Sequence, residues 1–157
     1  MGELTLIPKR RLDVDTYFLA MADLVSQRST CRRRSVGCVL VDDRNRVLAT
    51  GYNGVASGDV HCLDMPCPGA GLPSGTGLDE CHAIHAEQNA ILQCQDVTKI
   101  FSAYITVSPC VSCAKLLMNT SCGRIVFSEE YTSTAAKQFW NREWICHGSI
   151  KHVFTRK

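Results

Sequence analysis

The sequence predicts an α/β protein whose mixed sheet carries helices on both faces. Short β-branched or apolar runs of strand length alternate with segments of helical periodicity along the 157 residues. The first two runs follow one another across turn residues 42–45, as in a hairpin, whereas each later run follows a helical segment, as in right-handed crossovers. The length, without a linker or repeat, indicates one domain over residues 1–157.

The first half of the chain begins with a helix and a hairpin. Residues 13–29 carry apolar residues at helical spacing, and Asp13 or Asp15 is available as an N-cap. The apolar and β-branched runs 35–41 and 46–54 are the two hairpin strands.

An irregular insert separates the two halves. Residues 55–82 are rich in glycine, proline and cysteine, so little regular structure is expected there. An ordered segment of this length without a core of its own usually carries function or is held by a metal. The second half predicts a helix from about His85, a strand at 102–107, a helix at about 110–120, a strand at 124–128, a helix near 132–145 and a strand at 150–154.

The charge and composition exclude several classes of protein. A net charge of +2 is too small to favour a nucleic acid partner, because nucleic acid binders usually present a strongly basic face. The first residues lack the apolar core of a signal peptide, and no run reaches the roughly 18 apolar residues of a membrane span. We therefore expect a cytoplasmic protein without a membrane partner.

Ten cysteines stand out against this composition. In a reducing compartment, such thiols are more often metal ligands or small buried hydrophobes than disulfides. Four lie in apolar or helical surroundings and are expected to pack in the core: Cys38, Cys94, Cys122 and Cys146. The other six remain as candidate metal ligands.

The segment VSPCVSC at 107–113 predicts half of a zinc site. Ser108 is a suitable N-cap and Pro109 suits the first helical position, so that Cys110 and Cys113 share one face of the first turn. The helix dipole and the free N–H groups there favour thiolate over thiol. Two thiolates converging at a helix N-terminus provide two of the four ligands of a tetrahedral zinc.

His85 is the expected third ligand, and Glu87 the expected proton carrier. Residues at i and i+2 of a helix do not face each other, so Glu87 is not expected to bind the metal beside His85. Three protein ligands leave one position for water, whose pKa zinc lowers to about 7. A carboxylate nearby can pass the proton of that water to a ring nitrogen and a leaving amine. H-A-E followed by P-C-x-x-C is typical of zinc-dependent nucleobase deaminases.

Five segments carry a more specific resemblance: STCRRRSVGCVLV at 29–41, GYNG at 51–54, HCLDMPC at 61–67, CHAIHAEQNAI at 81–91 and SPCVSCAKLL at 108–117. Together they resemble the deoxycytidylate (dCMP) deaminases of bacteria and phages, over about residues 14–154. The resemblance implies a three-layer α/β/α, cytidine deaminase-like fold with a five-stranded mixed sheet. It also implies hydrolysis of dCMP to dUMP and ammonia, which feeds thymidylate synthesis, in the host cytoplasm if the chain is phage-encoded.

The same resemblance assigns roles to individual residues. Zinc falls on His85, Cys110 and Cys113. The proton shuttle falls on Glu87, Asn53 contacts the sugar, and the backbone N–H of Ala86 meets the base carbonyl.

The arginine run 32–34 is the expected phosphate site. It lies between the first helix and the first strand, where a guanidinium can make a bidentate phosphate contact, and Arg34 is our candidate within it. Tyr131 matches a tyrosine that lies near the phosphate in relatives. The alternative is a solvated arginine run on the surface.

Four cysteines within or beside the insert predict a second, structural zinc that organises it: Cys31, Cys62, Cys67 and Cys81. Phage relatives bind a second zinc through cysteines that match Cys31 and Cys62. Their other ligands differ, so Cys67 and Cys81 are inferred for this chain, with His82 as a substitute. The alternative is free thiols in a loosely held insert.

The resemblance also implies regulation and assembly. Family members are commonly homohexamers, activated by dCTP and inhibited by dTTP with magnesium, at a site that involves the GYNG region. This places effector contacts at Gly51, Tyr52 and Gly54.

Two other functions compete with dCMP deamination. The same zinc core serves deaminases of dCTP, of other cytosine nucleosides or nucleotides, of cytosine and of tRNA adenosine; the arginine run and the GYNG…HC segment favour a nucleotide. A non-catalytic zinc module that binds nucleic acid or protein would explain the cysteines and arginines but not Glu87. A fourth protein ligand beside Cys110 would favour that module.

Overall fold

A five-stranded mixed sheet is the centre of the computed structural model, which describes residues 11–150. The strands lie in the order β2-β1-β3-β4-β5. Their bounds are β1 Gly37–Val41, β2 Val47–Tyr52, β3 Ser102–Val107, β4 Arg124–Glu129 and β5 Glu143–Cys146. Strand β1 is antiparallel to β2 and β3, whereas β3, β4 and β5 are mutually parallel. The predicted mixed sheet is therefore confirmed.

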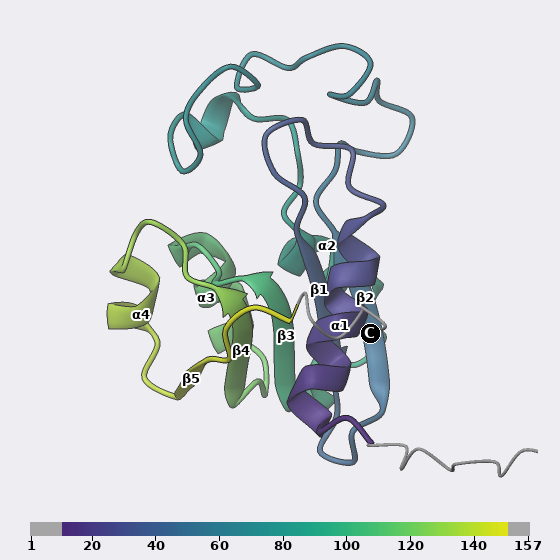
Figure 1. Ribbon diagram of the computed structural model, residues 1–157, viewed down its shortest axis with the longest axis vertical. Coiled ribbons are helices and arrows are strands. Elements are labelled where there is room, and N and C mark those ends of the chain that lie inside the picture. The colour runs from purple at the N-terminus through teal and green to yellow at the C-terminus, as the bar shows by residue number, and fades with distance from the viewer. Residues whose placement is uncertain (1–10, 151–157) are drawn as a thin grey trace, which may run out of the picture.

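Helices cover both faces of this sheet, as the sequence predicts (Figure 1). Helix α1 (Val14–Ser26) packs on one face, where Val39 and Val41 of β1 point. Helices α2 (Ala86–Gln93) and α3 (Val111–Met118) pack on the other, against Cys38 and Leu40. The alternation along β1 gives two separate apolar clusters, because successive strand residues face opposite sides. No helix within residues 11–150 has the length and apolarity needed to cross a membrane.

The N-terminal cap of α1 is Asp13, one of the two predicted candidates. Its carboxylate accepts the N–H of Thr16 at 2.9 Å and the hydroxyl of the same residue at 2.7 Å. These bonds satisfy a helix N–H that has no partner within the helix. They lower the pKa of the Asp13 carboxyl, with the backbone bond as the largest cause.

The insert is closed at its base and projects beyond one end of the sheet (Figure 1). Gly54 and Ile84 exchange backbone hydrogen bonds of 3.1 and 2.8 Å, so the chain leaves and returns at one point. Within residues 55–82 the regular structure is confined to the 3-10 turn η1 (Leu78–Glu80), as expected for this composition. Because Ile84, shortly after the insert, pairs with Gly54 beside the end of β2, the next residue, His85, caps α2 close to the sheet.

The C-terminal part differs from the sequence prediction. In place of a helix over 132–145, the chain forms a short helix α4 (Ala135–Phe139) and then β5. Pairing with β4 wins over helical periodicity because it buries Trp144 against Phe127, with ring centroids 5.3 Å apart. Ile150, the first residue of the predicted strand 150–154, is not in a strand, and the rest of that range lies outside the described residues.

The cysteines predicted to pack in the core do so unevenly. Cys38 and Cys122 are fully buried, and Cys94 is half-buried against the core. Cys146 is exposed, so its assignment as a packing residue is wrong. It ends β5, the edge strand, where half of the side chains face away from the core.

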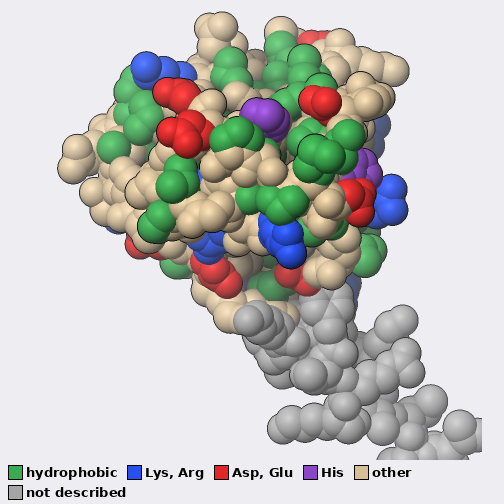
Figure 2. Space-filling view, turned by 90° about the horizontal axis from the view of Figure 1, so that it is seen from above, with side chains coloured by type: hydrophobic (Ala, Val, Ile, Leu, Met, Phe, Trp, Pro, Cys, Tyr) green, Lys and Arg blue, Asp and Glu red, His purple; other side chains and the backbone are tan. Residues whose placement is uncertain are grey.

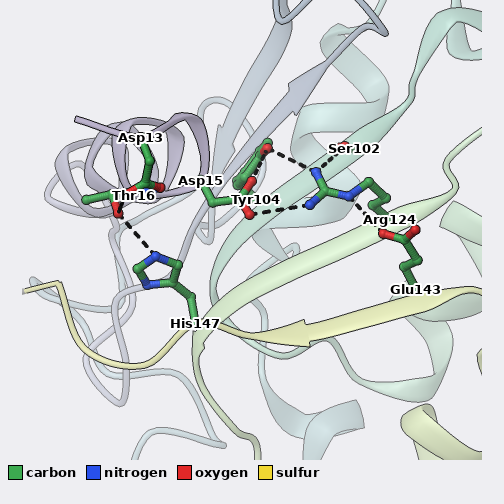
Figure 3. A network of polar contacts seen from close by, with 8 residues as sticks. All are labelled: Asp13, Asp15, Thr16, Ser102, Tyr104, Arg124, Glu143 and His147. Atoms are coloured by element: carbon green, nitrogen blue, oxygen red, sulfur yellow. Dashed lines mark hydrogen bonds and ion pairs between the residues drawn. The ribbon is translucent and has the colours of Figure 1, made fainter. Parts of the chain in front are cut away.

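A polar network ties α1 to the amino ends of the parallel strands (Figure 3). The Tyr104 hydroxyl donates to Asp15 at 2.7 Å, and Arg124 reaches Asp15 at 3.3 Å and Glu143 at 2.9 Å. The carboxyl ends of β3 and β4 lie at the other end of the sheet. Helix α3 begins directly after β3 at that end, where the candidate site is formed.

Candidate active site

Three metal-binding side chains meet where α2 and α3 begin. The Nδ1 atom of His85 lies 3.5 Å from Sγ of Cys110 and 3.3 Å from Sγ of Cys113. In residues 11–150, no other group of three or more His, Cys, Asp or Glu donors lies within 4.8 Å of one another. The sequence thus correctly predicted that these three residues come together.

The donor set fits zinc. With Zn–S of about 2.3 Å and Zn–N of about 2.0 Å, a tetrahedral zinc spaces a sulfur and a nitrogen ligand by about 3.5 Å. The two observed N···S distances match this spacing. Because the group contains three donors, one tetrahedral position is left for a solvent molecule or substrate. This argues against the non-catalytic module, which needs a fourth protein ligand.

The start of α3 differs from the sequence prediction. Cys110, not Ser108, is the N-cap, and the helix begins at Val111, so Pro109 lies before it. The Ser108 hydroxyl instead accepts the backbone N–H of Tyr131 at 2.7 Å, which joins the end of β3 to the segment after β4. Cys110 and Cys113 still share the first turn, because N-cap and N3 positions lie on one side of a helix.

The conformation of His85 explains how residues two apart face one cavity. His85 is the N-cap of α2, with extended backbone angles of φ −69° and ψ 155°, so its side chain does not follow the helical rotation to Glu87. Its N–H donates to the Gln88 side chain at 2.8 Å, which fixes the turn. Glu87 is only 4% exposed, although a carboxylate is rarely buried without a partner.

Burial sets the protonation chemistry of the site. It raises the pKa of the Glu87 carboxyl, and this carboxyl contacts the Cys113 thiol. The Cys110 pKa falls to about 4, chiefly because the Cys113 thiol donates to it, and the same contact raises the pKa of Cys113. A bound dication would favour the ionised form of all three groups.

A small cavity of about 90 Å³ is lined by Glu87 and by His85. Further lining residues come from the end of β2, the arginine run, the insert and the segment after β4: Asn53, Arg33, Arg34, Ser74, Leu78 and Tyr131. Sequence reasoning missed Ser74 and Leu78, because no motif distinguishes them within the irregular insert.

Asn53 lines this cavity but also holds its wall together. Its Nδ2 donates to the Arg34 carbonyl at 2.7 Å, and its Oδ1 accepts the N–H of Val36 at 2.8 Å. The second N–H of the amide remains for a ligand. Ala86 is fully buried at the first position of α2, between His85 and Glu87.

The three arginines of the run lie in different surroundings. Arg32 is exposed and does not line the cavity. Arg33 donates to two carbonyls of the insert, Gly69 at 3.0 Å and Thr76 at 2.9 Å. Arg34 lines the cavity and pairs with Glu129 at 2.8 Å. Of the three arginines, only Arg32 is fully on the surface.

The insert cysteines form a looser group. The Sγ atoms of Cys62 and Cys67 lie 3.7 Å apart, and Cys81 is near enough to Cys67 to help lower its pKa. The pKa of Cys67 is lowered, first by the backbone N–H of His82 and then by these thiols. Cys31 and Cys81 both line the cavity that contains Glu87, and the His82 side chain is exposed.

The GYNG residues have packing roles that sequence reasoning missed. A Cβ on Gly51 would collide with the backbone of α2 at Ala86 and Ala90. Gly54 closes the base of the insert with Ile84. The Tyr52 carbonyl accepts from Asn89 at 2.8 Å, and its side chain lines a separate cavity of about 560 Å³ together with Arg28.

The face from which the insert projects, seen in Figure 2, shows no continuous basic patch. In Figure 2, hydrophobic, acidic and basic side chains alternate over this face.

Comparison with known proteins points to one family. The family described as "Cytidine and deoxycytidylate deaminase zinc-binding region" matches residues 12–129, which include both zinc-ligand motifs and Glu87. Deoxycytidylate deaminase of Mycobacterium phage D29 is 40% identical over 126 residues, which cover 76% of this chain and 98% of that protein. Deoxycytidylate deaminase of Schizosaccharomyces pombe is 39% identical over 121 residues, 74% of this chain but only 37% of that relative's length.

A solved structure shows the same fold. The dCMP deaminase of cyanophage S-TIM5, in apo form, superposes with a TM-score of 0.66 at 24% identity, over 87% of this chain and 99% of that one. The predicted cytidine deaminase-like fold is thereby confirmed. Given the match over residues 12–129, this chain belongs to the cytidine and deoxycytidylate deaminase family.

Proposed function

We propose that this chain catalyses the hydrolytic deamination of dCMP to dUMP and ammonia. The observation that carries the proposal is a buried carboxylate, Glu87, in a cavity with a three-donor metal site. Structural zinc sites have no use for such a carboxylate, whereas a deaminase needs one to move protons. The phage and yeast relatives named as deoxycytidylate deaminases support the choice of substrate.

Within this mechanism His85, Cys110 and Cys113 would hold the zinc. When bound, zinc supplies a Lewis acid that lowers the pKa of water in the site. Glu87 accepts the proton of the attacking water and delivers protons to the ring nitrogen and the departing amine. Its carboxylate is buried in the cavity that His85 and Cys110 also line.

The remaining contacts orient the nucleotide. The backbone N–H of Ala86, at the first position of α2, donates to the base carbonyl, since the first N–H groups of a helix have no internal partner. The free N–H of Asn53 contacts the sugar. Arg34 and Tyr131 bind the phosphate, for which Arg34 has donors beyond the one that pairs with Glu129.

A second, structural zinc is proposed for Cys31, Cys62, Cys67 and Cys81. Two thiolates on a tetrahedral zinc lie about 3.8 Å apart, and the 3.7 Å between Cys62 and Cys67 matches this. Metal analysis should find two zinc ions per chain, one of which is lost in Cys67→Ser. One zinc per wild-type chain would contradict the second site.

We further propose that dCTP and the magnesium complex of dTTP regulate a homohexamer of this chain. The separate cavity beside Tyr52, next to Gly51 and Gly54, would receive the nucleotide, and Arg28 offers its phosphates a cation. Sedimentation would test the oligomer, and a sigmoidal dCMP dependence that dCTP abolishes would test the regulation.

The decisive experiment measures ammonia release from dCMP, dCTP, cytidine and cytosine in parallel, each with and without dCTP or dTTP. The activity on dCMP should exceed the others. Glu87→Gln should keep its zinc and lose turnover, whereas the matched Glu130→Gln, at an exposed residue, should keep both. A Glu87→Gln protein with near-normal turnover would contradict the mechanism, and a preference for dCTP or cytidine would contradict the substrate.

A further inference from the structure

Arg33 joins the two ends of a loop in the insert. Its Nη1 atom donates to the carbonyl of Gly69 at 3.0 Å and to the carbonyl of Thr76 at 2.9 Å. A single guanidinium therefore spans the neck of the loop 69–76. Arg33 itself is half-buried and precedes β1, so the loop is attached to the rigid sheet and not only to its own chain neighbours.

The loop turns sharply towards the catalytic cavity. Gly75 and Gly77 have φ angles of +85° and +55°, which residues with a side chain rarely adopt. The backbone of Gly75 approaches Tyr131 so closely that an added Cβ would lie 2.9 Å from its hydroxyl oxygen. These turns place Ser74 and Leu78 in the wall of the cavity that contains Glu87.

Two neighbouring cavities share part of their lining. Leu78, Tyr131 and Cys110 line both the catalytic cavity of about 90 Å³ and one of about 190 Å³ that extends to Ser112 and Ala136. Ligand sites usually measure roughly 300–1,000 Å³. Neither cavity reaches this range alone, so the position of Leu78 determines how much room a nucleotide finds.

We propose that Arg33 is a positioning residue for substrate binding: by tethering the insert, it holds Leu78 and Ser74 as the wall that fits the nucleotide. The inference rests on the proposed nucleotide deamination. Without the tether, the loop must be ordered when substrate binds, and this cost weakens binding. The hydrogen bonds of the Arg33 side chain go to the insert and not to Glu87 or the three metal-site donors, so these four groups are expected to keep their geometry.

Steady-state kinetics of Arg33→Ala test the positioning role. The loss of two hydrogen bonds of about 1 kcal/mol each predicts a KM for dCMP that rises about ten- to thirtyfold, while kcat changes less than about threefold. Arg33→Lys should recover part of the loss, because an ammonium can still donate to a carbonyl. Arg44→Ala removes the same charge from an exposed residue of the β1–β2 turn and should leave both constants unchanged.

Amide hydrogen exchange of the substrate-free, zinc-loaded proteins distinguishes two effects. One is the loss of the Arg33 hydrogen bonds that hold the loop, and the other is the loss of the Leu78 side chain that lines the cavity. Arg33→Ala should speed exchange in residues 69–80 by several-fold and leave the sheet unchanged. Leu78→Ala should raise KM as well, by roughly three- to tenfold through lost apolar contact, with exchange in 69–76 unchanged.

Four outcomes would overturn the inference. The first is a KM for dCMP that is unchanged in Arg33→Ala. The second is an unchanged rate of amide hydrogen exchange in residues 69–80 of the same variant. An equal fall of kcat and zinc content that Arg33→Lys does not rescue would reduce Arg33 to a purely structural role. A wild-type protein without nucleotide deaminase activity would overturn the proposed function and this inference with it, whereas active wild type with an insensitive KM overturns the inference alone.

Discussion

Gly51 of β2 packs directly against the backbone of Ala90 in α2: a Cβ at Gly51 would lie 2.9 Å from Ala90 Cα and closer still to its nitrogen. Real Cβ atoms do not approach this closely, so only glycine fits between strand and helix. Because α2 starts with His85 and Glu87, this contact sets how far the metal site lies from the sheet.

Gly51→Ala should therefore damage both stability and activity. Overpacking costs about 1–3 kcal/mol in unfolding free energy, and the displaced α2 carries His85 and Glu87 away from Cys110. Urea unfolding and kcat for dCMP measure the two effects. Gly71→Ala is the matched control, since its Cβ would meet nothing within 4 Å, and it should stay within about 0.5 kcal/mol of wild type. A Gly51→Ala protein as stable as this control would contradict the close packing.

Asp42 should make stability depend on pH at the β1–β2 turn. Its carboxylate accepts the N–H groups of Arg44 and Arg46 at 2.9 Å each and pairs with Arg46 Nε at 3.0 Å. These contacts lower the pKa of Asp42, with the Arg46 backbone bond as the largest cause. The folded pKa lies below the unfolded value of about 3.9, so the stabilisation is complete above that value and is lost as the pH falls through the folded pKa.

Asp42→Ala is the corresponding variant. Its denaturation midpoint should fall below that of wild type at pH 7, and the difference should shrink as the pH drops below about 4. Asp43→Ala, at the exposed neighbouring residue, should follow the wild-type curve throughout. A difference between Asp42→Ala and wild type that persists undiminished to pH 2 would rule out the carboxylate as its cause.

Local patterns predicted much of the fold and the grouping of the site. The hairpin, the first helix and the strand–helix order up to β4 follow from periodicity, because each of these segments buries one face. That His85, Cys110 and Cys113 come together was predictable, because each motif begins a helix. Two helices that start at the same end of a sheet bring their first residues together.

Other features depend on contacts that no local pattern encodes. The stretch before Cys146 has helical spacing, but the exposed edge of β4 selects a strand there. Ser108 looks like an N-cap, yet its hydroxyl is engaged by Tyr131 from a segment 23 residues later. The tether of Arg33 ends on backbone carbonyls of the insert, which every residue possesses, so the sequence gives no sign of it.

Arg124 should be energetically coupled to Asp15 across the end of the sheet (Figure 3). Its side chain is 22% exposed and bonds Asp15, Glu143 and Tyr104, so its removal takes a cation from the partly buried Asp15 carboxylate, which keeps the hydroxyl of Tyr104. Arg124→Met should lower the unfolding free energy by about 1–3 kcal/mol. The double variant with Asp15→Asn should cost less than the two single changes added together.

A second ion pair, exposed on the surface, serves as the control for this double-mutant cycle. Lys99 and Asp96 form an ion pair of 3.9 Å with both side chains exposed, and exposed pairs contribute little. A double-mutant cycle on that pair should show no measurable coupling. If the Arg124–Asp15 cycle gives the same result, the network does not hold α1 to the sheet.

Removal of zinc should loosen the contact between α2 and α3 more than the sheet. His85 comes from the start of one helix and the two cysteines from the other, so a bound metal joins elements whose side chains otherwise meet only at their ends. A ligand that binds only the folded state adds to stability by mass action, so chelation should lower Tm, and added zinc should restore it.

Cys113→Ser should lose one zinc per chain and lower Tm by a similar amount, because a buried serine replaces a thiolate ligand. Cys146→Ser, at an exposed thiol outside the site, should keep the zinc content and Tm of wild type. If Cys113→Ser retains full zinc, the metal is held by other residues and the assignment of this site is wrong.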